Sequence, residues 1–388
     1  MNMPNFKNAE LTFDADLIRR YECNGPRYTS YPTAVHFTAS FDVGAYRKAA
    51  LLSNDSAMPL SLYIHVPFCA SPCFYCGCTR VITRSTTEGD RYVAALSTEI
   101  ELQAALFSRE RRVEQIHFGG GTPTFLTLPQ IEEILQHIDK EFSLAPPAER
   151  ESSIEIDPRT VSVAAMAGLA GLGFNRISLG IQDFDPAVQA AVNRLQTVEQ
   201  TRDLVDAARR YGISAINFDL IYGLPRQTPA SFARTLDTVI ELRPTRIAAY
   251  GYAHLPTLFK AQRRINAAEL PNAAERLELL RLTIERLTNA GYYYIGMDHF
   301  ALPEDPLAQA LLEGRLHRNF QGYSSQPDSD LIGLGVSAIG KIGTSYAQNT
   351  KVLRDYYERI SRHQLAIVRG LKLTSNDRIR RDVIQALM

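Results

Sequence analysis

Residues 65–78 read HVPFCASPCFYCGC, the most informative stretch of the chain. Cys69, Cys73 and Cys76 stand there at CxxxCxxC spacing, in a loop directly after the strand-like run Leu62–Val66. A loop this short can place three thiolates around one cubic iron–sulfur cluster, whose irons prefer thiolate ligands. Three ligands for four irons leave one iron open, and an open iron is a binding site for chemistry.

Two other interpretations involve the neighbouring Cys78. It could be the fourth ligand of a structural zinc site, although a single residue between Cys76 and Cys78 is closer than zinc spacing usually allows. It could also be a fourth ligand of the cluster. The fifth cysteine, Cys23, stands alone and is typical of a small apolar residue.

Composition and charge describe an ordinary globular protein of 388 residues, with 45% apolar and 22% charged residues. Forty-two basic residues balance 42 acidic ones, which argues against nucleic acid or anionic membrane as partner. No apolar run reaches the ~18 residues of a membrane span, and no signal peptide is evident. We therefore expect a cytoplasmic protein, where thiols stay reduced and clustered cysteines indicate a metal site.

Strand-like runs alternate with longer amphipathic stretches, a pattern that predicts an α/β fold with a parallel sheet. Unusual residues follow the end of each run, which favours a barrel over an open sheet. We expect a partial (β/α)6 barrel over residues 51–265, an N-terminal arm over 1–50 and a mostly helical C-terminal extension over 266–388. The predicted strands are Leu62–Val66, Gln115–Phe118, Ser153–Ile156, Arg176–Gly180, Ala215–Leu220 and Arg246–Tyr250, and the clearest helices are Asp90–Leu106, Pro129–Phe142, Thr197–Tyr211 and Asn272–Ala290.

The cysteine loop, with an aromatic residue before its third cysteine, resembles that of the radical S-adenosylmethionine (SAM) superfamily. Other motifs narrow the resemblance to the oxygen-independent coproporphyrinogen III oxidases (dehydrogenases) of haem biosynthesis. The similarity runs from about residue 20 to the last residue. Its motifs are GPRYTSYPT (25–33), CGC (76–78), GGGTP (119–123), GIQDF (180–184), DLIYGLP (219–225) and HRNFQGY (317–323).

The resemblance implies an oxidoreductase that converts two propionate side chains of coproporphyrinogen III to vinyl groups without oxygen, giving protoporphyrinogen IX. One [4Fe-4S] cluster and two SAM molecules are implied, and SAM cleavage would yield a 5′-deoxyadenosyl radical that takes a hydrogen from the propionate. A low-potential donor such as a flavodoxin or ferredoxin, and a monomeric state, are also implied. This chemistry requires no acid–base pair or nucleophile, so we assign no catalytic residue.

Matching positions imply which residues bind SAM. Those around the first molecule are Tyr63, Gly120, Glu155 and Ile339, and those around the second are Tyr75, Gly121, Thr122, Gln182, Arg194, Asp219 and Ala253. Arg194 would pair the methionine carboxylate, and Glu155 would accept hydrogen bonds from amino or ribose hydroxyl groups. The alternatives are a solvated helix charge for Arg194 and a surface salt bridge for Glu155.

The substrate carries four carboxylates, so a neutral chain must concentrate positive charge in its pocket. Arg27 in the N-terminal arm and Arg318 in the HRNFQGY motif are the candidates, and Lys341 is a weaker one. Each of them is otherwise typical of a solvated surface charge.

Relatives continue for some tens of residues past the position of Met388, so we expect an incomplete C-terminal region and a less covered active site. A haem-binding chaperone of the same superfamily and an inactive remnant are the alternative functions. Such chaperones typically lack the RYTSYP arm and carry phenylalanine at the position of Cys78. Both features here favour the oxidase.

Overall fold

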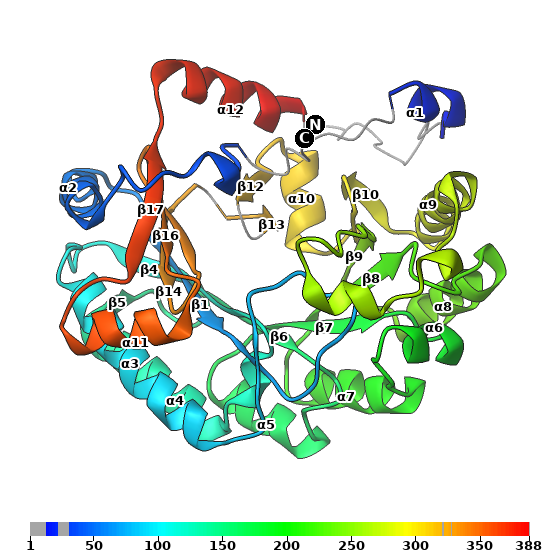
Figure 1. Cartoon of the computed structure of the whole chain (residues 1–388), viewed down its shortest axis with the longest axis horizontal. Helices are drawn as coiled ribbons and strands as arrows, with labels where there is room; N and C mark the ends of the chain where they lie inside the picture. Colours follow the sequence, from blue (N-terminus) through cyan, green and yellow to red (C-terminus); the bar gives the residue numbers. More distant parts are fainter. Residues whose placement is uncertain (1–12, 22–30, 320–321, 327, 388) are drawn as a thin grey trace.

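The computed structural model describes residues 13–21, 31–319, 322–326 and 328–387. One large sheet runs through the molecule, and its middle consists of parallel strands that pair in chain order (Figure 1). These strands confirm the six predicted ones: β1 (Leu60–Val66), β4 (Arg112–Gly120), β6 (Glu151–Ile156), β7 (Arg176–Gln182), β8 (Ala215–Tyr222) and β9 (Arg246–Gly251). No pairing among the described residues joins the two ends of the sheet, so the predicted partial barrel is confirmed.

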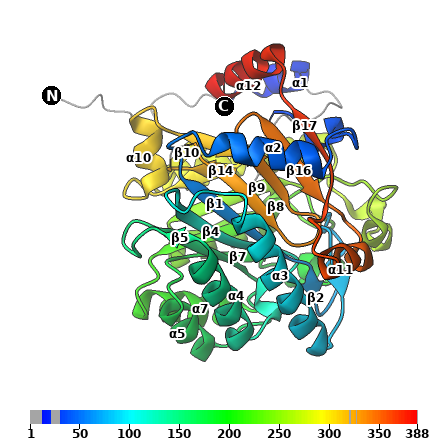
Figure 2. The same ribbon diagram turned by 90° about the vertical axis from the view of Figure 1, so that its left-hand side faces the viewer.

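Helices cover the outer face of these strands (Figures 1 and 2). Several begin with capping boxes, for example Thr127 with Gln130 and Asn272 with Glu275, which satisfy the first backbone N–H groups. The covering helices are α3 (Thr87–Ala104), α4 (Leu128–Glu141), α5 (Val163–Gly171), α6 (Pro186–Ala191), α7 (Val198–Arg210), α8 (Pro229–Leu242) and α9 (Ala273–Asn289).

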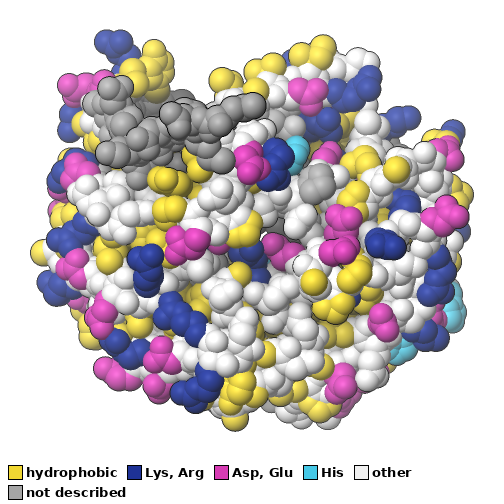
Figure 3. Space-filling view, turned by 180° about the vertical axis from the view of Figure 1, so that it is seen from behind, with side chains coloured by type: hydrophobic (Ala, Val, Ile, Leu, Met, Phe, Trp, Pro, Cys, Tyr) yellow, Lys and Arg dark blue, Asp and Glu magenta, His cyan; other side chains and the backbone are white. Residues whose placement is uncertain are grey.

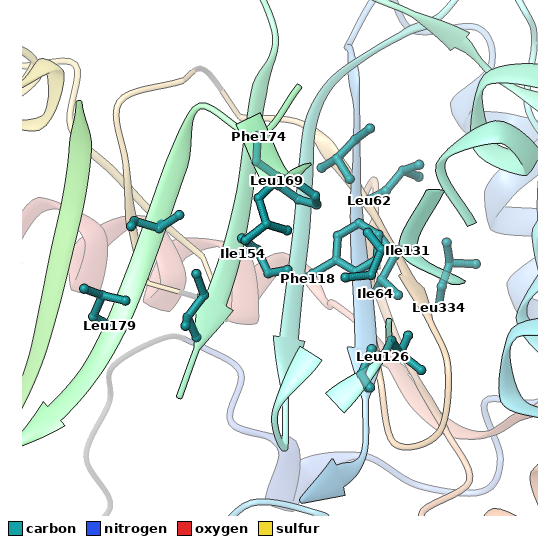
Figure 4. Packing of buried hydrophobic residues seen from close by; sticks show 14 of the residues in the cluster. Leu62, Ile64, Phe118, Leu126, Ile131, Ile154, Leu169, Phe174, Leu179 and Leu334 are labelled. Atoms are coloured by element: carbon teal, nitrogen blue, oxygen red, sulfur yellow. The ribbon is translucent and has the colours of Figure 1, made fainter. Parts of the chain in front are cut away.

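The core lies between the sheet and these helices. Phe118 of β4 packs edge-on against Phe174, with ring centroids 5.5 Å apart, and Ile131 of α4 lies beside them (Figure 4). Along β7 the buried residues Ile177 and Leu179 alternate with half-buried ones. Because successive side chains of a strand point to opposite faces, the half-buried set faces the barrel interior.

The sheet continues into the C-terminal region, which sequence reasoning missed. Strand β14 (Asp330–Leu334) pairs in parallel with β1 and leads to antiparallel β15 (Ile339–Ile342), β16 (Ser345–Asn349) and β17 (Ile367–Lys372). Every residue of β14 and β16 is buried, so neither strand shows the alternation that identifies a strand from sequence. The boundary at residue 265 stays a prediction, because the hydrogen bonding of the sheet continues across it.

The remaining elements are short or lie at the edges. None of the helices in the described residues is both long and apolar enough to cross a bilayer. These elements are α1 (Ala15–Tyr21), α2 (Val43–Ser53), β2 (Phe68–Cys69), β3 (Val81–Ile82), β5 (Ser143–Leu144), β10 (Tyr293–Gly296), β11 (His299–Ala301), α10 (Pro306–Leu312), β12 (His317–Asn319), β13 (Gly322–Ser324), α11 (Leu353–Ser361) and α12 (Ser375–Leu387).

The face opposite to the view of Figure 1 carries basic and acidic side chains interspersed with one another (Figure 3). Mixed charges fit the neutral overall composition.

Candidate active site

The cysteine loop follows β1 and contacts the residues that follow the C-terminal end of β4. Phe68–Cys69 forms β2, which pairs with β3, and the Cys69 Sγ lies 3.5 Å from the Thr122 hydroxyl. Cys69, Cys73, Cys76 and Cys78 all line one pocket at the carboxyl ends of the strands. This is the edge at which barrel enzymes place their chemistry.

Cationic groups surround this loop. Arg159 and Arg194 point a guanidinium at the Cys73 Sγ, at 3.4 and 3.5 Å. The pKa of Cys76 is lowered to about 6, first by the hydrogen bond with Cys78 and then by Arg80, whereas burial raises the pKa of Cys69. At Cys76 this favours the thiolate, which is the form that ligates a metal.

The arrangement fits a cluster better than a single ion. In the described part of the chain no three Cys, His, Asp or Glu side chains are grouped to hold one metal ion. A zinc site needs four donors around one point, whereas each cysteine of a cubane binds a different iron. Cys69, Cys73 and Cys76 line one pocket, and their assignment to a cluster stays a prediction.

The glycines after β4 let the two loops pack closely. A Cβ on Gly120, whose φ is +120°, would lie 2.7 Å from His65, and one on Gly121 would lie 2.8 Å from the Pro67 backbone. Both contacts are shorter than carbon atoms tolerate, so only glycine fits at these positions. The backbone of the GGGTP motif thereby forms one wall of the cluster pocket.

Glu155 connects two pockets. It accepts hydrogen bonds from the Gly120 N–H at 3.1 Å and from His117 at 3.3 Å, and His117 stacks on Tyr63. Burial opposes ionisation of Glu155, but these partners outweigh it and lower its pKa. Glu155 lines the cluster pocket and also a second pocket that holds Tyr63 and Ile339, so the predicted first-SAM residues are brought together.

Arg194 lies in the cluster pocket but already has partners. Its Nη1 donates to Asp157 at 3.1 Å and its Nη2 to the Gly180 carbonyl at 2.6 Å, while its Nε is buried without an acceptor among the described residues. The interpretation as a solvated helix charge is wrong, because only 7% of the side chain is exposed. A SAM carboxylate at Arg194 would have to share it with Asp157.

The other second-SAM positions are mostly gathered in the same pocket. Gln182 takes a left-handed backbone conformation with φ of 67°, at a shift in the register between β7 and β8. Asp219 accepts from Ser178 at 2.7 Å, and burial raises its pKa to about 6. Tyr75, Gly121, Thr122, Gln182, Arg194 and Asp219 all line this pocket.

Two predicted residues lie elsewhere, and a third is not among the described residues. Ala253 is exposed outside both pockets, although its carbonyl and that of Tyr75 accept from the same Gln262 amide. Arg318 lines a separate pocket with Tyr31 and helix α12. Arg27 falls outside the described residues, so its role stays a prediction.

Sequence reasoning missed Arg159 and His117 as site residues. Arg159 binds Asp157 and contacts Cys73, and His117 supports both Glu155 and Tyr63. Their position was the available signal, because Arg159 follows the third strand closely and His117 is an inward-facing residue of the second. Neither stood in a motif that the resemblance had highlighted.

Comparisons with known proteins agree with this geometry. Residues 63–239 match the family model described as the radical SAM superfamily. The fold and the cysteine loop thus define a radical SAM enzyme. An oxygen-independent coproporphyrinogen III oxidase of Pseudomonas aeruginosa is 53% identical over 378 residues, which cover 97% of this chain and 82% of the relative.

Two Escherichia coli comparisons point the same way. The enzyme of that name from strain K12 is 48% identical over 98% of this chain and 82% of its own length. A solved structure described as coproporphyrinogen III oxidase, a radical SAM enzyme, superposes with a TM-score of 0.91 at 47% identity, over 97% of this chain and 84% of that one. The chain belongs to the oxygen-independent coproporphyrinogen III oxidase family.

Proposed function

We propose that this chain performs the anaerobic oxidative decarboxylation of two propionates of coproporphyrinogen III. The observation that carries the proposal is the pocket that joins Cys69, Cys73 and Cys76 to the GGGTP wall and to polar strand ends, in a chain 53% identical to an enzyme of that name. When bound, the [4Fe-4S] cluster and SAM supply a carbon-centred radical.

The residues of the chain position the reactants and exclude water. The three thiols would hold the cluster, and the glycine wall at Gly120–Gly121 brings backbone close to it. Arg159 and Arg194 place two positive charges beside Cys73, which offset the negative charge of thiolate ligands. No side chain has to act as a nucleophile or a general base.

Two SAM sites are part of the proposal. The pocket of Tyr63, Glu155 and Ile339 supports the first, because Glu155 offers carboxylate oxygens beside a stacked aromatic pair. Arg194 and Asp219, with opposite charges in the cluster pocket, support the second. The methionine part of SAM carries both an amino and a carboxylate group, which matches this pairing.

Three further features rest on the resemblance and belong to the proposal. The one-electron reductant is a low-potential flavodoxin or ferredoxin. The enzyme is a monomer in the cytoplasm. Its substrate is held by cationic side chains, of which Arg27 and Arg318 remain candidates.

An anaerobic assay tests the function. The reconstituted protein receives SAM, a strong one-electron reductant and coproporphyrinogen III, and both tetrapyrrole products and 5′-deoxyadenosine are measured, with Cys73→Ser as the control. Protoporphyrinogen in wild type alone supports the proposal. Deoxyadenosine without decarboxylated product shows radical formation without substrate control, and neither product from a cluster-loaded chain overturns the proposal. A haem titration of the same sample tests the chaperone alternative.

A further inference from the structure

A cavity crosses the interior of the barrel from the cluster pocket to the opposite ends of the strands. Its volume is about 330 Å³, and it shares Glu155 and Asp219 with the cluster pocket. Its other end contains Arg176 and Arg246, the first residues of β7 and β9. Because a strand rises about 3.3 Å per residue, Arg176 lies roughly 13 Å along β7 from Gly180 at the cluster edge.

The far end of this cavity holds two arginines, each with one acidic partner. Arg176 Nη2 lies 3.1 Å from Glu151, and Arg246 Nε donates to Asp305 at 2.7 Å. Burial and the nearby Arg176 lower the pKa of Arg246 to about 10, so it remains charged at neutral pH. His299 adds no charge, because burial and neighbouring arginines lower its pKa to about 3.

Both guanidinium groups keep donors that no described residue satisfies. The Nε and Nη1 of Arg176 and the Nη2 of Arg246 are buried and have no acceptor among the described residues. A buried donor without a partner is costly, so such groups usually indicate a missing acceptor. The two side chains are 12% and 11% exposed, and both residues line the cavity.

The two ends of the cavity therefore differ. Glu155 and Asp219 stand at the cluster end, whereas Arg176 and Arg246 stand at the far end together with Glu151, and the two arginines keep unmet hydrogen-bond donors there. A guanidinium binds a carboxylate through two parallel hydrogen bonds, which makes an organic carboxylate the best match for the unmet donors. A phosphate would fit the same fork, but the proposed substrate carries carboxylates only.

We propose that Arg176 and Arg246 bind a carboxylate of the tetrapyrrole substrate, one that belongs to a propionate other than the reacting one. The inference rests on the proposed function and adds a second anchoring point to it. A ring with carboxylates on opposite edges would then lie across the barrel, with one propionate toward the cluster and another at the basic end. Arg176 and Arg246 would select the substrate through its number of carboxylates.

Equilibrium binding of coproporphyrin III, the stable tetracarboxylate, tests this directly. Binding is measured by fluorescence in cluster-loaded wild type, Arg176→Gln, Arg176→Lys and the control Arg202→Gln, whose side chain pairs with Glu241 on the surface. Losing a charge-assisted pair should raise the Kd of Arg176→Gln about 10- to 100-fold. Arg176→Lys keeps the positive charge but cannot donate two parallel hydrogen bonds, so its Kd should lie between those of wild type and Arg176→Gln. Arg202→Gln should match wild type.

Cluster absorbance and SAM binding show that each variant is folded, and the KM for coproporphyrinogen III should rise in parallel with the Kd. If Arg176→Gln is unfolded, the Lys variant still decides the question. An unchanged Kd in a folded Arg176 variant overturns the inference, as does a wild type that does not bind coproporphyrin III. Wild type that binds the porphyrin through Arg176 but makes no product would overturn the proposed function and leave this site standing.

Discussion

Two regions meet at His65, and they are built in opposite ways. On one side lies the cysteine loop, whose backbone at Thr79 is 3.1 Å from the His65 Nε2. On the other lies the turn after β14, whose Ser337 hydroxyl is 3.4 Å from the same nitrogen. The loop is continuous in sequence, whereas the turn is held by residues from several distant elements. The cysteine loop, which comes from one stretch of sequence, therefore packs against a scaffold, the turn after β14 and the residues that hold it, which comes from several distant stretches.

The scaffold centres on Glu99 of α3, a carboxylate with no exposed surface. It accepts from the Gly335 N–H at 2.6 Å, from Asn349 at 2.7 Å and from the Tyr356 hydroxyl at 2.8 Å. The Tyr92 hydroxyl extends this hydrogen-bond network, because it donates to the His65 carbonyl and accepts from the Val336 N–H of the turn. Helix α3, the C-terminal strands and α11 are thereby joined behind the pocket that holds Tyr63 and Ile339.

The largest expected effect is on the cysteine loop. Replacing Cys73 with alanine should abolish the broad cluster absorption near ~400 nm, since three thiolates are the minimum for one cubane. The matched control is Cys78→Ala, which should retain the cluster because we assign no iron to Cys78. Anaerobic absorption spectra and iron content measure both. A full, SAM-responsive cluster in Cys73→Ala would refute the ligand assignment.

The second largest effect is expected from a substitution in the scaffold, at Glu99. Glu99→Ala removes the acceptor of three buried hydrogen bonds and leaves the Gly335 N–H and the Tyr356 hydroxyl without a partner, whereas the Asn349 amide still donates to the Gly335 carbonyl. We therefore expect a loss of about 3–5 kcal/mol in the free energy of unfolding. SAM binding should weaken as well, because the turn that carries Ser337 and Ile339 loses its anchor. Denaturant unfolding and SAM titration measure the two effects, with the exposed Glu101→Ala on the same helix as control. Normal stability in Glu99→Ala would show that folding does not depend on the hydrogen bonds that Glu99 accepts.

The difference between the two regions also marks what the sequence could predict. The six parallel strands, four helices and the cysteine site follow from period, spacing and strand-end position, all of which are local signals. Strands β14 and β16 could not be predicted in this way, because each has five residues and all of them are buried. The partners of Glu99 are 236 to 257 residues away in sequence, and no local pattern links them.

Arg194 illustrates the same limit inside the site. Its place in the pocket followed from the resemblance, but its ion pair with Asp157 required the fold. Arg159 was missed for that reason, since its role depends on where Cys73 lies in space. Sequence reasoning predicted the types of groups present and not their partners.

The scaffold should also respond to pH. Burial raises the pKa of Glu99 from 4.5 to about 7 in the folded protein. The folded state then holds the proton more tightly than the unfolded chain, so the Glu99 contribution is fully present below pH 4.5 and is lost as pH rises through about 7. The pKa shift corresponds to a loss of about 3 kcal/mol in the free energy of unfolding. The surrounding Tyr46, Tyr92 and Tyr356 stay neutral over this range, because burial raises the pKa of each.

Urea unfolding of wild type and Glu99→Gln between pH 4.5 and 8 isolates this contribution, since glutamine does not titrate. The stability of wild type relative to the variant should fall as pH rises. A difference that is constant over this range would show that Glu99 keeps an ordinary pKa.

The smallest expected effect is at Arg194, which contacts Cys73 of the cysteine loop. Arg194→Ala removes a cation from the pocket that we propose for the second SAM and should raise the Kd for SAM about 10-fold, the value of one charge-assisted hydrogen bond. The cluster should survive, because Arg159 still contacts the Cys73 Sγ and supplies a positive charge. Equilibrium dialysis of SAM and iron analysis measure both quantities, with the surface variant Arg202→Ala as control.

The outcome separates two roles for the same side chain. Weaker SAM binding with intact iron content means that Arg194 serves the cofactor, as the resemblance implies. Loss of iron means that its contact with Cys73 at 3.5 Å and its pair with Asp157 hold the loop in place, and the second-SAM assignment then fails. In that case the cysteine loop, like the turn on the far side of His65, depends on a distant buried charge for its shape, and the contrast between the two regions would be one of degree.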